Sequence, residues 1–174
     1  SCDPTKLDLA TDDDGFLMQF SNLTTIDITG LCNVNLIGKS FLFEAKALQA
    51  IDLSPLENVT SVDVNFMATC EALTNVDCSS MYALKSIDDG FMSYCKNLTN
   101  IDLSNLSNLE TIKGSFLFNN ANMTSANLVG WTSLKTIGSM FLSGCSKLTS
   151  VDLSKSTSLT YICTSFLNSC SQLS

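Results

Sequence analysis

A phenylalanine recurs every 25 residues along this chain, with no insertion or deletion between copies. Its seven members are Phe16, Phe41, Phe66, Phe91, Phe116, Phe141 and Phe166. A fixed period between about 20 and 50 residues indicates a repeat architecture, in which one unit cannot bury its apolar face alone and must stack on its neighbours. Every other residue can therefore be read by its place in the period, counted from each phenylalanine as position 0.

The apolar positions within the period predict the local structure of one coil. Positions 10 and 12 are apolar in nearly every copy, as in Ile101 and Leu103, and alternate with polar positions, which predicts a half-buried strand. Positions 0, 1, 4 and 7 share one helical face and predict a short helical turn. Positions 15, 18 and 21 are evenly spaced by three and predict a 3₁₀ turn or an extended connection. Successive coils should stack about 4.8 Å apart.

Two motifs carry a resemblance to a known family. The pattern L-x-x-I-D-L at residues 98–103 is similar to the strand of a leucine-rich repeat. With the spacing L-x-x-I-x-x-x-F-x-x-x-C-x-x-L, it resembles the BspA-like, or Treponema-type, leucine-rich repeats of surface proteins, over residues 16–174. The resemblance implies a β-rich leucine-rich repeat solenoid with short helical turns, right-handed and curved, of about seven 25-residue coils. It also implies export and adhesion to a host or matrix molecule.

The two ends of the chain differ from the repeat. Residues 1–15 break the register and contain Asp12-Asp13-Asp14-Gly15, which predicts an N-terminal cap on a solenoid of residues 16–174. The last repeat stops at Ser174, which predicts an end-to-end contact with another chain, or a longer protein. Cys2 follows a small residue and is a candidate remnant of a lipoprotein site. No apolar run approaches the ~18 residues of a transmembrane helix.

Charge excludes several classes of partner. The chain has 9 basic residues, 17 acidic residues and no histidine, with a net charge of −8. Binding to nucleic acid needs clustered cations that can contact phosphates, and binding to an anionic membrane surface needs them too. We therefore expect neither partner.

Cysteine is read through the repeat. Cys70, Cys95, Cys145 and Cys170 share position 4, an apolar position, and Cys78 stands where other copies have leucine. We interpret them as buried thiols that pack as small hydrophobic groups. Disulfides between stacked neighbours are the alternative, which parallel Cβ directions disfavour.

Position 11 is the main candidate site. It points outward between two buried strand residues, so stacking should place its side chains in a column about 5 Å apart. Like charges at that spacing should raise one another's pKa, unless hydroxyl and amide neighbours solvate them. The column comprises Asp27, Asp52, Asp77, Asp102, Asn127 and Asp152.

Three interpretations of this column remain. The aspartates could keep the sheet face soluble and prevent lateral strand pairing. They could form a polar binding face, for which Ca²⁺ is a conceivable occupant because it prefers oxygen ligands. They could also supply a carboxylate pair of the retaining-glycosidase type. The monotonous repetition and the absence of arginine and histidine disfavour this third interpretation.

The copy at residues 116–140 departs from the others. Asn127 and Val129 make an uncharged gap in the outward column, and Trp131 replaces a leucine. The residue one repeat later is the small Ser156, so we favour packing of Trp131 over that residue rather than a role in binding. The five N-x-S/T sequons, at Asn22, Asn58, Asn97, Asn105 and Asn122, are interpreted as by-products of the repeat.

These observations predict a non-enzymatic recognition or adhesion module that binds a protein or a glycan. Its weak candidate binding residues are Asp27, Asp52, Asp77, Asp102, Asn127, Val129 and Asp152. We assign no catalytic residue and no metal ligand. The alternatives are a structural spacer in a larger surface protein and, more remotely, a carbohydrate-active enzyme.

Overall fold

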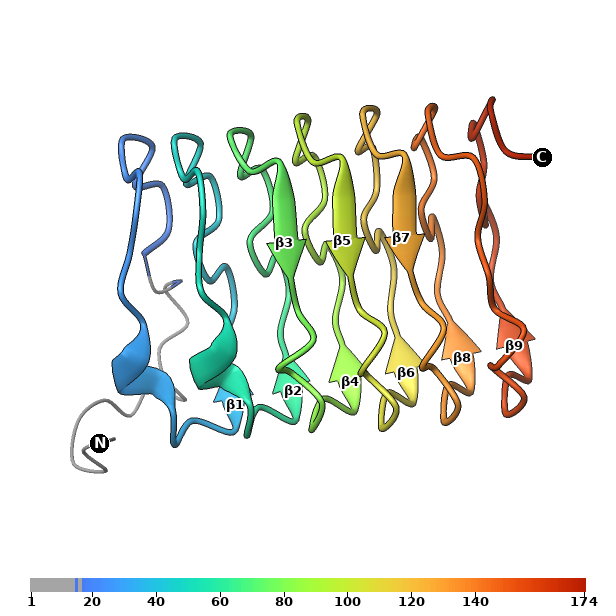
Figure 1. Ribbon diagram of the computed structural model, residues 1–174, viewed down its shortest axis with the longest axis horizontal. Coiled ribbons are helices and arrows are strands. Elements are labelled where there is room, and N and C mark those ends of the chain that lie inside the picture. The colour runs from blue at the N-terminus through green and yellow to red at the C-terminus, as the bar shows by residue number, and fades with distance from the viewer. Residues whose placement is uncertain (1–14, 16) are drawn as a thin grey trace.

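The computed structural model describes residues 15 and 17–174, and its coils stand side by side in one row (Figure 1). The phenylalanine rings stack along this row with centroid distances between 5.2 and 5.4 Å and interplanar angles of at most 15°. Equivalent positions therefore lie next to one another in successive coils, and the predicted leucine-rich repeat solenoid is confirmed. The expected cap at residues 1–15 lies outside the described residues except for Gly15, and the candidate lipoprotein residue Cys2 lies outside them too.

The larger sheet was not anticipated as a sheet. Six parallel strands occupy positions 20 and 21 of successive coils, where we expected only a return segment. The position 21 side chain points into the core and is buried from Ile37 to Ile137. Five strand pairings connect the six strands, and each pairing is offset by one full period. The larger sheet therefore makes fewer complete turns than the seven coils expected. The strands are β1 (Leu36–Ile37), β2 (Ser61–Val62), β4 (Ser86–Ile87), β6 (Thr111–Ile112), β8 (Thr136–Ile137) and β9 (Tyr161–Ile162).

The smaller sheet is the predicted strand face. Its three parallel strands are β3 (Asn75–Asp77), β5 (Asn100–Asp102) and β7 (Ser125–Asn127), again offset by one period from strand to strand. The middle residue of each strand faces inward and the outer two face out. In the first two coils a 3₁₀ helix follows this segment, η1 (Thr29–Leu31) and η2 (Ser54–Leu56).

The helical turn predicted at positions 0, 1, 4 and 7 is wrong. The backbone there passes through the left-handed region at alternate residues, with φ of 51° at Met67 and 62° at Thr69. The Met67 N–H donates back to the Phe41 carbonyl, 2.8 Å away, and the Thr69 N–H donates forward to the Ser93 carbonyl, also at 2.8 Å. At this corner, hydrogen bonds between coils therefore alternate with single-turn bonds, such as that from the Ala68 N–H to the Asn65 carbonyl at 3.2 Å, and no helix forms.

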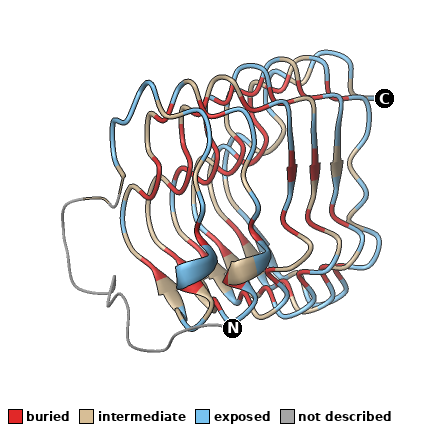
Figure 2. Ribbon diagram, turned by 60° about the vertical axis from the view of Figure 1, so that its left-hand side comes forward, coloured by how far each residue is buried: buried red, intermediate tan, exposed pale blue. Residues whose placement is uncertain are grey.

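A single apolar core runs through all coils (Figure 2). The position 4 thiols lie in it as predicted, and Cys70, Cys78, Cys95, Cys145, Cys163 and Cys170 are free. The Cys95 thiol donates to the Met67 carbonyl at 3.3 Å, and burial raises the pKa of the Cys70 thiol to about 12. Cys32 is disulfide-bonded. None of the helical segments in the described part of the chain has the length and apolarity of a membrane span.

The divergent coil at 116–140 packs Trp131 inside the body. Its side chain is fully buried and meets the rings of Phe116 and Phe141 edge-on, at centroid distances of 5.7 and 6.2 Å. The indole N–H donates to the Leu103 carbonyl at 3.0 Å. Trp131 therefore packs within the core and is not available to bind a ligand.

Candidate functional site

The position 11 side chains form a column, as predicted, and three of them (Asp77, Asp102 and Asn127) lie on the smaller sheet. We call the outward side chains at positions 9, 11 and 13 the ladder face. Asp77 pairs in register with Asp102, and Asp102 with Asn127. The side chains of Asp27, Asp52, Asp77, Asn127 and Asp152 are exposed, and Asp102 is half-buried.

Each aspartate of the column is held by its own coil. One carboxylate oxygen, Oδ1, accepts a hydrogen bond from the backbone N–H of the residue two places on, at 2.8–3.0 Å. This is the local side-chain-to-backbone pattern that short polar residues form in turns. The donors are the N–H groups of Thr29, Ser54, Ser79, Ser104 and Ser154.

Solvation by neighbouring donors, the alternative that the sequence left open, prevents a net rise in pKa at Asp27, Asp52, Asp77 and Asp152. Hydrogen bonds from the position 13 backbone and hydroxyl lower the pKa of Asp27 and Asp52, with the backbone bond the larger cause. The same two bonds lower the pKa of Asp77 and Asp152, where the serine hydroxyl is the larger cause. Repulsion from Asp27 and Asp77 acts on Asp52 in the opposite direction but is weaker. The carboxylates are therefore ionised and oriented at neutral pH.

The gap in the column is also ordered. Asn127 donates its side-chain amide to Asp102 Oδ1 at 3.2 Å, and this joins the gap to the last aspartate before it. Val129 stands where four other coils have serine, and 44 % of it is exposed. The ladder face therefore carries one uncharged and partly apolar place between charged coils.

A second row of polar groups supports the column. The Asn100 side-chain amide donates to Asn75 Oδ1 at 3.1 Å, and the Ser125 hydroxyl donates to Asn100 Oδ1 at 2.7 Å. The Thr99 hydroxyl donates to the Thr74 carbonyl at 2.9 Å. These bonds connect one coil to the next, so the outward groups at position 9 are fixed relative to one another.

This geometry suits presentation of charge better than catalysis. A glycosidase of the carboxylate-pair type needs one acid with a raised pKa as proton donor, whereas four of the aspartates in this column have a lowered pKa. The part of the chain that the structure describes contains no group of three or more histidine, cysteine, aspartate or glutamate side chains able to hold a metal ion. The ladder carboxylates are spread along the row and do not converge.

The larger sheet carries two shallow hollows that the sequence did not indicate. One, of about 270 Å³, lies along β1, β2, β4 and β6 and is lined by Asp63, Asp88 and Lys113 among others. The other, of about 480 Å³, lies beside Gly138 and extends to Tyr161 and Cys163. Lys113 forms an ion pair with Asp88 at 2.6 Å and lines both hollows. Position 20 varies between coils in size and polarity, so no repeated motif marks this surface.

The stacked strands, the apolar columns and the row of phenylalanines define a leucine-rich repeat solenoid. The chain matches the family described as BspA type leucine rich repeat region, in six copies, over residues 13–129 and 81–174. These matches cover most of the sequence, and the chain belongs to this family. Neither the curated proteins nor the solved structures gave a match.

Proposed function

We propose that this chain is an exported, non-enzymatic recognition module that binds a protein or a glycan through its ladder face. The binding residues would be Asp27, Asp52, Asp77, Asp102, Asn127, Val129 and Asp152. The observation that carries the proposal is the row of ionised carboxylates, each held by a hydrogen bond from its own coil. Membership of a family of protein-interaction repeats supports the same function.

The order of the ladder face favours binding. The outward side chains are already held in place, so fewer of them have to be ordered when a ligand binds. Association therefore costs less conformational entropy. Each carboxylate is held through Oδ1 by a backbone N–H of its own coil, and the residue remains exposed in four of the five aspartates. No lysine occupies the outward positions 9, 11 or 13 of any complete copy. Charge complementarity therefore favours a partner that presents cations or several hydrogen-bond donors.

Export is part of the proposal. BspA-type repeats are typical of surface-associated proteins, and Cys32 is disulfide-bonded. Disulfides persist in oxidising compartments and are rare in reducing ones. We therefore place the chain at the cell surface or in the extracellular medium.

Removal of charge from the ladder face tests the proposal. The triple variant Asp52→Asn, Asp77→Asn and Asp102→Asn removes three charges but keeps an acceptor oxygen for each internal hydrogen bond. The control Glu57→Gln, Glu71→Gln and Glu110→Gln makes the same change in net charge away from the ladder face. Wild type and both variants would be applied to arrays of purified extracellular-matrix proteins and oligosaccharides, and the dissociation constant of each hit measured.

We expect the triple aspartate variant to bind its ligand at least about tenfold more weakly, which corresponds to the loss of one charge-assisted contact. The glutamate control should bind like wild type. Equal binding by all three proteins would refute a role for the ladder face. Absence of any ligand, together with an unchanged fold, would favour the structural spacer.

A further inference from the structure

The N-x-S/T sequons of this chain differ in what their asparagine side chains do. Four of them, at Asn58, Asn97, Asn105 and Asn122, are preceded by a full coil of described residues and can be compared. Three of the four are engaged in hydrogen bonds between coils, and one is not.

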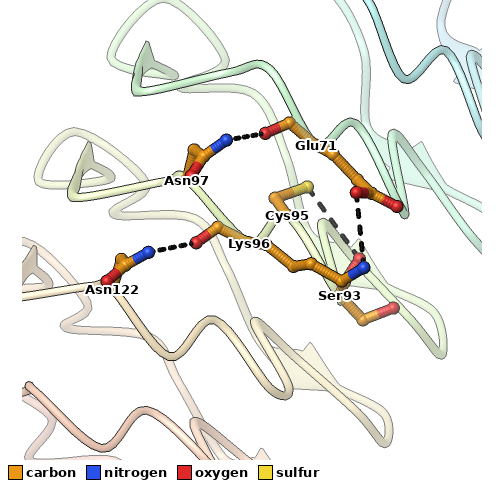
Figure 3. A network of polar contacts seen from close by, with 6 residues as sticks. All are labelled: Glu71, Ser93, Cys95, Lys96, Asn97 and Asn122. Carbon is orange, nitrogen blue, oxygen red and sulfur yellow. Dashed lines mark hydrogen bonds and ion pairs between the residues drawn. The ribbon is translucent and has the colours of Figure 1, made fainter.

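The three engaged asparagines each donate the side-chain amide to a backbone carbonyl of the preceding coil. Asn97 bonds to the Glu71 carbonyl and Asn122 to the Lys96 carbonyl, both at 2.9 Å (Figure 3). Asn58 bonds in the same way to the Cys32 carbonyl at 2.9 Å. Asparagine at these places is therefore explained by the stacking of the coils, and the sequons there are by-products, as the sequence suggested.

The repeat position, and not the sequon, determines this bond. Asn108 shares position 17 with Asn58, is not part of a sequon, and donates to the Tyr82 carbonyl at 2.9 Å. Ser158, at the same position, donates its hydroxyl to the Thr132 carbonyl at 2.9 Å. The nitrogen that a glycan would occupy is thus committed to the preceding coil at Asn58, Asn97 and Asn122.

Asn105 differs from these three in its place in the repeat and in its hydrogen bonding. It stands at position 14, where the other copies have glycine, proline, serine or lysine, so the repeat does not call for an asparagine there. The residue is exposed, and its side chain makes no hydrogen bond to any described residue. Its partner in the sequon, Ser107, is exposed in the same turn.

The next coil presents no side chain at the position equivalent to Asn105. Gly130 occupies the equivalent position there, and a Cβ added to it would collide with the Ser104 carbonyl oxygen and come within 3.6 Å of the Asn105 backbone nitrogen. The close approach of the two backbones therefore excludes a side chain next to Asn105. The neighbouring Val129 is exposed, so the surface beside Asn105 is uncharged and partly apolar.

We infer that Asn105 is an N-glycosylation site of this chain, and that Asn58, Asn97 and Asn122 are not used in the folded protein. The co-substrate class is a polyprenyl-pyrophosphate-linked oligosaccharide. The Asn105 Nδ2 forms a bond to the anomeric carbon of the first sugar as the bond from that carbon to the pyrophosphate oxygen breaks. One Nδ2 proton is lost to a base of the transferase. The inference rests on the proposed export of the chain, because the transferase acts in a secretory compartment.

The glycan would stand at the edge of the ladder face, next to the gap formed by Asn127 and Val129. A sugar ring offers an apolar side that can cover Val129, and this coil has lost both the aspartate and the serine of the regular column. A glycan at Asn105 would then account for two features together, the uncharged gap at Asn127 and Val129 and the sequon without a side-chain hydrogen bond in the coil before it.

The test is secretion of the full chain from insect cells behind a supplied leader peptide. Release of glycans by an amidase in ¹⁸O-labelled water converts each occupied asparagine to a mass-tagged aspartate, which peptide mass spectrometry then locates. We expect the tag at Asn105 in most secreted molecules and none at Asn58, Asn97 or Asn122. Ser107→Ala should abolish the tag at Asn105, and Ser107→Thr, which keeps the sequon, should retain it.

An untagged Asn105 in folded, secreted protein would overturn the inference. Occupancy of Asn97 and Asn122 equal to that of Asn105 would overturn it too. Occupancy is read by mass and does not depend on ligand binding, so its failure is distinguishable from failure of the ladder face. Circular dichroism of Ser107→Ala shows whether a missing tag reflects misfolding, and Asn105→Gln provides a second variant without a sequon.

Discussion

Trp131 and Ser156 provide a quantitative test of the stacked columns. The two residues occupy position 15 in adjacent coils, where earlier coils have Leu31, Leu56, Met81 and Leu106. Trp131 reaches Phe141 in the next coil, and the Ser156 hydroxyl is buried without a hydrogen-bond partner. We infer that the large ring occupies the volume that a leucine at residue 156 would fill.

The loss of stability on replacing one of the two residues without the other can be estimated from their contacts. Trp131→Leu loses two edge-to-face ring pairs, each worth ~0.5–1.5 kcal/mol. It also loses the hydrogen bond to the Leu103 carbonyl, worth ~1 kcal/mol. We therefore expect destabilisation of about 3 kcal/mol from these losses together. Ser156→Leu alone should overpack the core and lose ~1–3 kcal/mol, partly offset by removal of the unpaired hydroxyl.

The double variant distinguishes compensation from independent effects. Trp131→Leu with Ser156→Leu recreates the leucine pair of the earlier coils, so we expect stability within about 1 kcal/mol of wild type and a favourable coupling of at least ~2 kcal/mol. Urea unfolding should be followed by circular dichroism, because Trp131 is the sole tryptophan and its fluorescence is lost in the variants. Additive losses, with a coupling below about 0.5 kcal/mol, would refute the volume argument.

Three further predictions concern the core, the ladder face and the free thiols. Asn120→Cys should raise the free energy of unfolding by ~1–2 kcal/mol, because it removes Asn120 Oδ1, which is buried without a hydrogen-bond partner. The new thiol should still donate to the Met92 carbonyl that Asn120 now contacts, as the Cys95 thiol does to the equivalent Met67 carbonyl. A loss of stability in urea titration would contradict this. The folded pKa of Asp52 and Asp77 lies below the unfolded value of 3.8, so their contribution is complete above that value and is lost as pH falls through the lower folded pKa. The melting temperature should accordingly be level from pH 7 to about 5 and fall below about pH 4, whereas a rise on mild acidification would show that repulsion dominates the column. A hydrogen bond with the Ser139 hydroxyl, at 3.1 Å, lowers the pKa of Cys163, and burial raises the pKa of the core thiols. Cys163 should therefore react first with a disulfide reagent in the native protein, and a fast phase that survives Cys163→Ser would disprove this.

Much of the fold follows from the sequence because the period constrains every coil in the same way. Stacking of the phenylalanines, burial of position 4 thiols and packing of Trp131 were all predicted from equivalent positions alone. The corner at Met67 and Thr69 was not, because its left-handed residues are not of the types that favour this conformation. Hydrogen bonds between coils outweigh the local preference there, although the places equivalent to Thr69 in two later coils hold Asn119 and Gly144, which favour the left-handed region.

The sequence did not predict the sheet at positions 20 and 21, and it left the charge state of the ladder face open between two outcomes. Ser61, Thr111 and Tyr161 share position 20 but no common polarity, so no alternation indicates a strand. The pKa direction of the aspartates depends on whether the side chain turns back to its own backbone, and spacing alone cannot decide this. The stacking of the column was predicted correctly, and solvation by its serine neighbours was one of the two outcomes expected for its charges.

The constant offset between paired strands also limits how such a chain can change over generations. Every pair is displaced by the same length of chain, from Leu36 and Ser61 to Thr136 and Tyr161. Duplication or excision of one whole unit within the gene would rejoin compatible surfaces, so the array can lengthen or shorten without redesign of its interior. Loss of a single codon would instead misalign every later coil with those before it. Selection on such a gene should tolerate gains and losses of whole units far better than gains and losses of single codons.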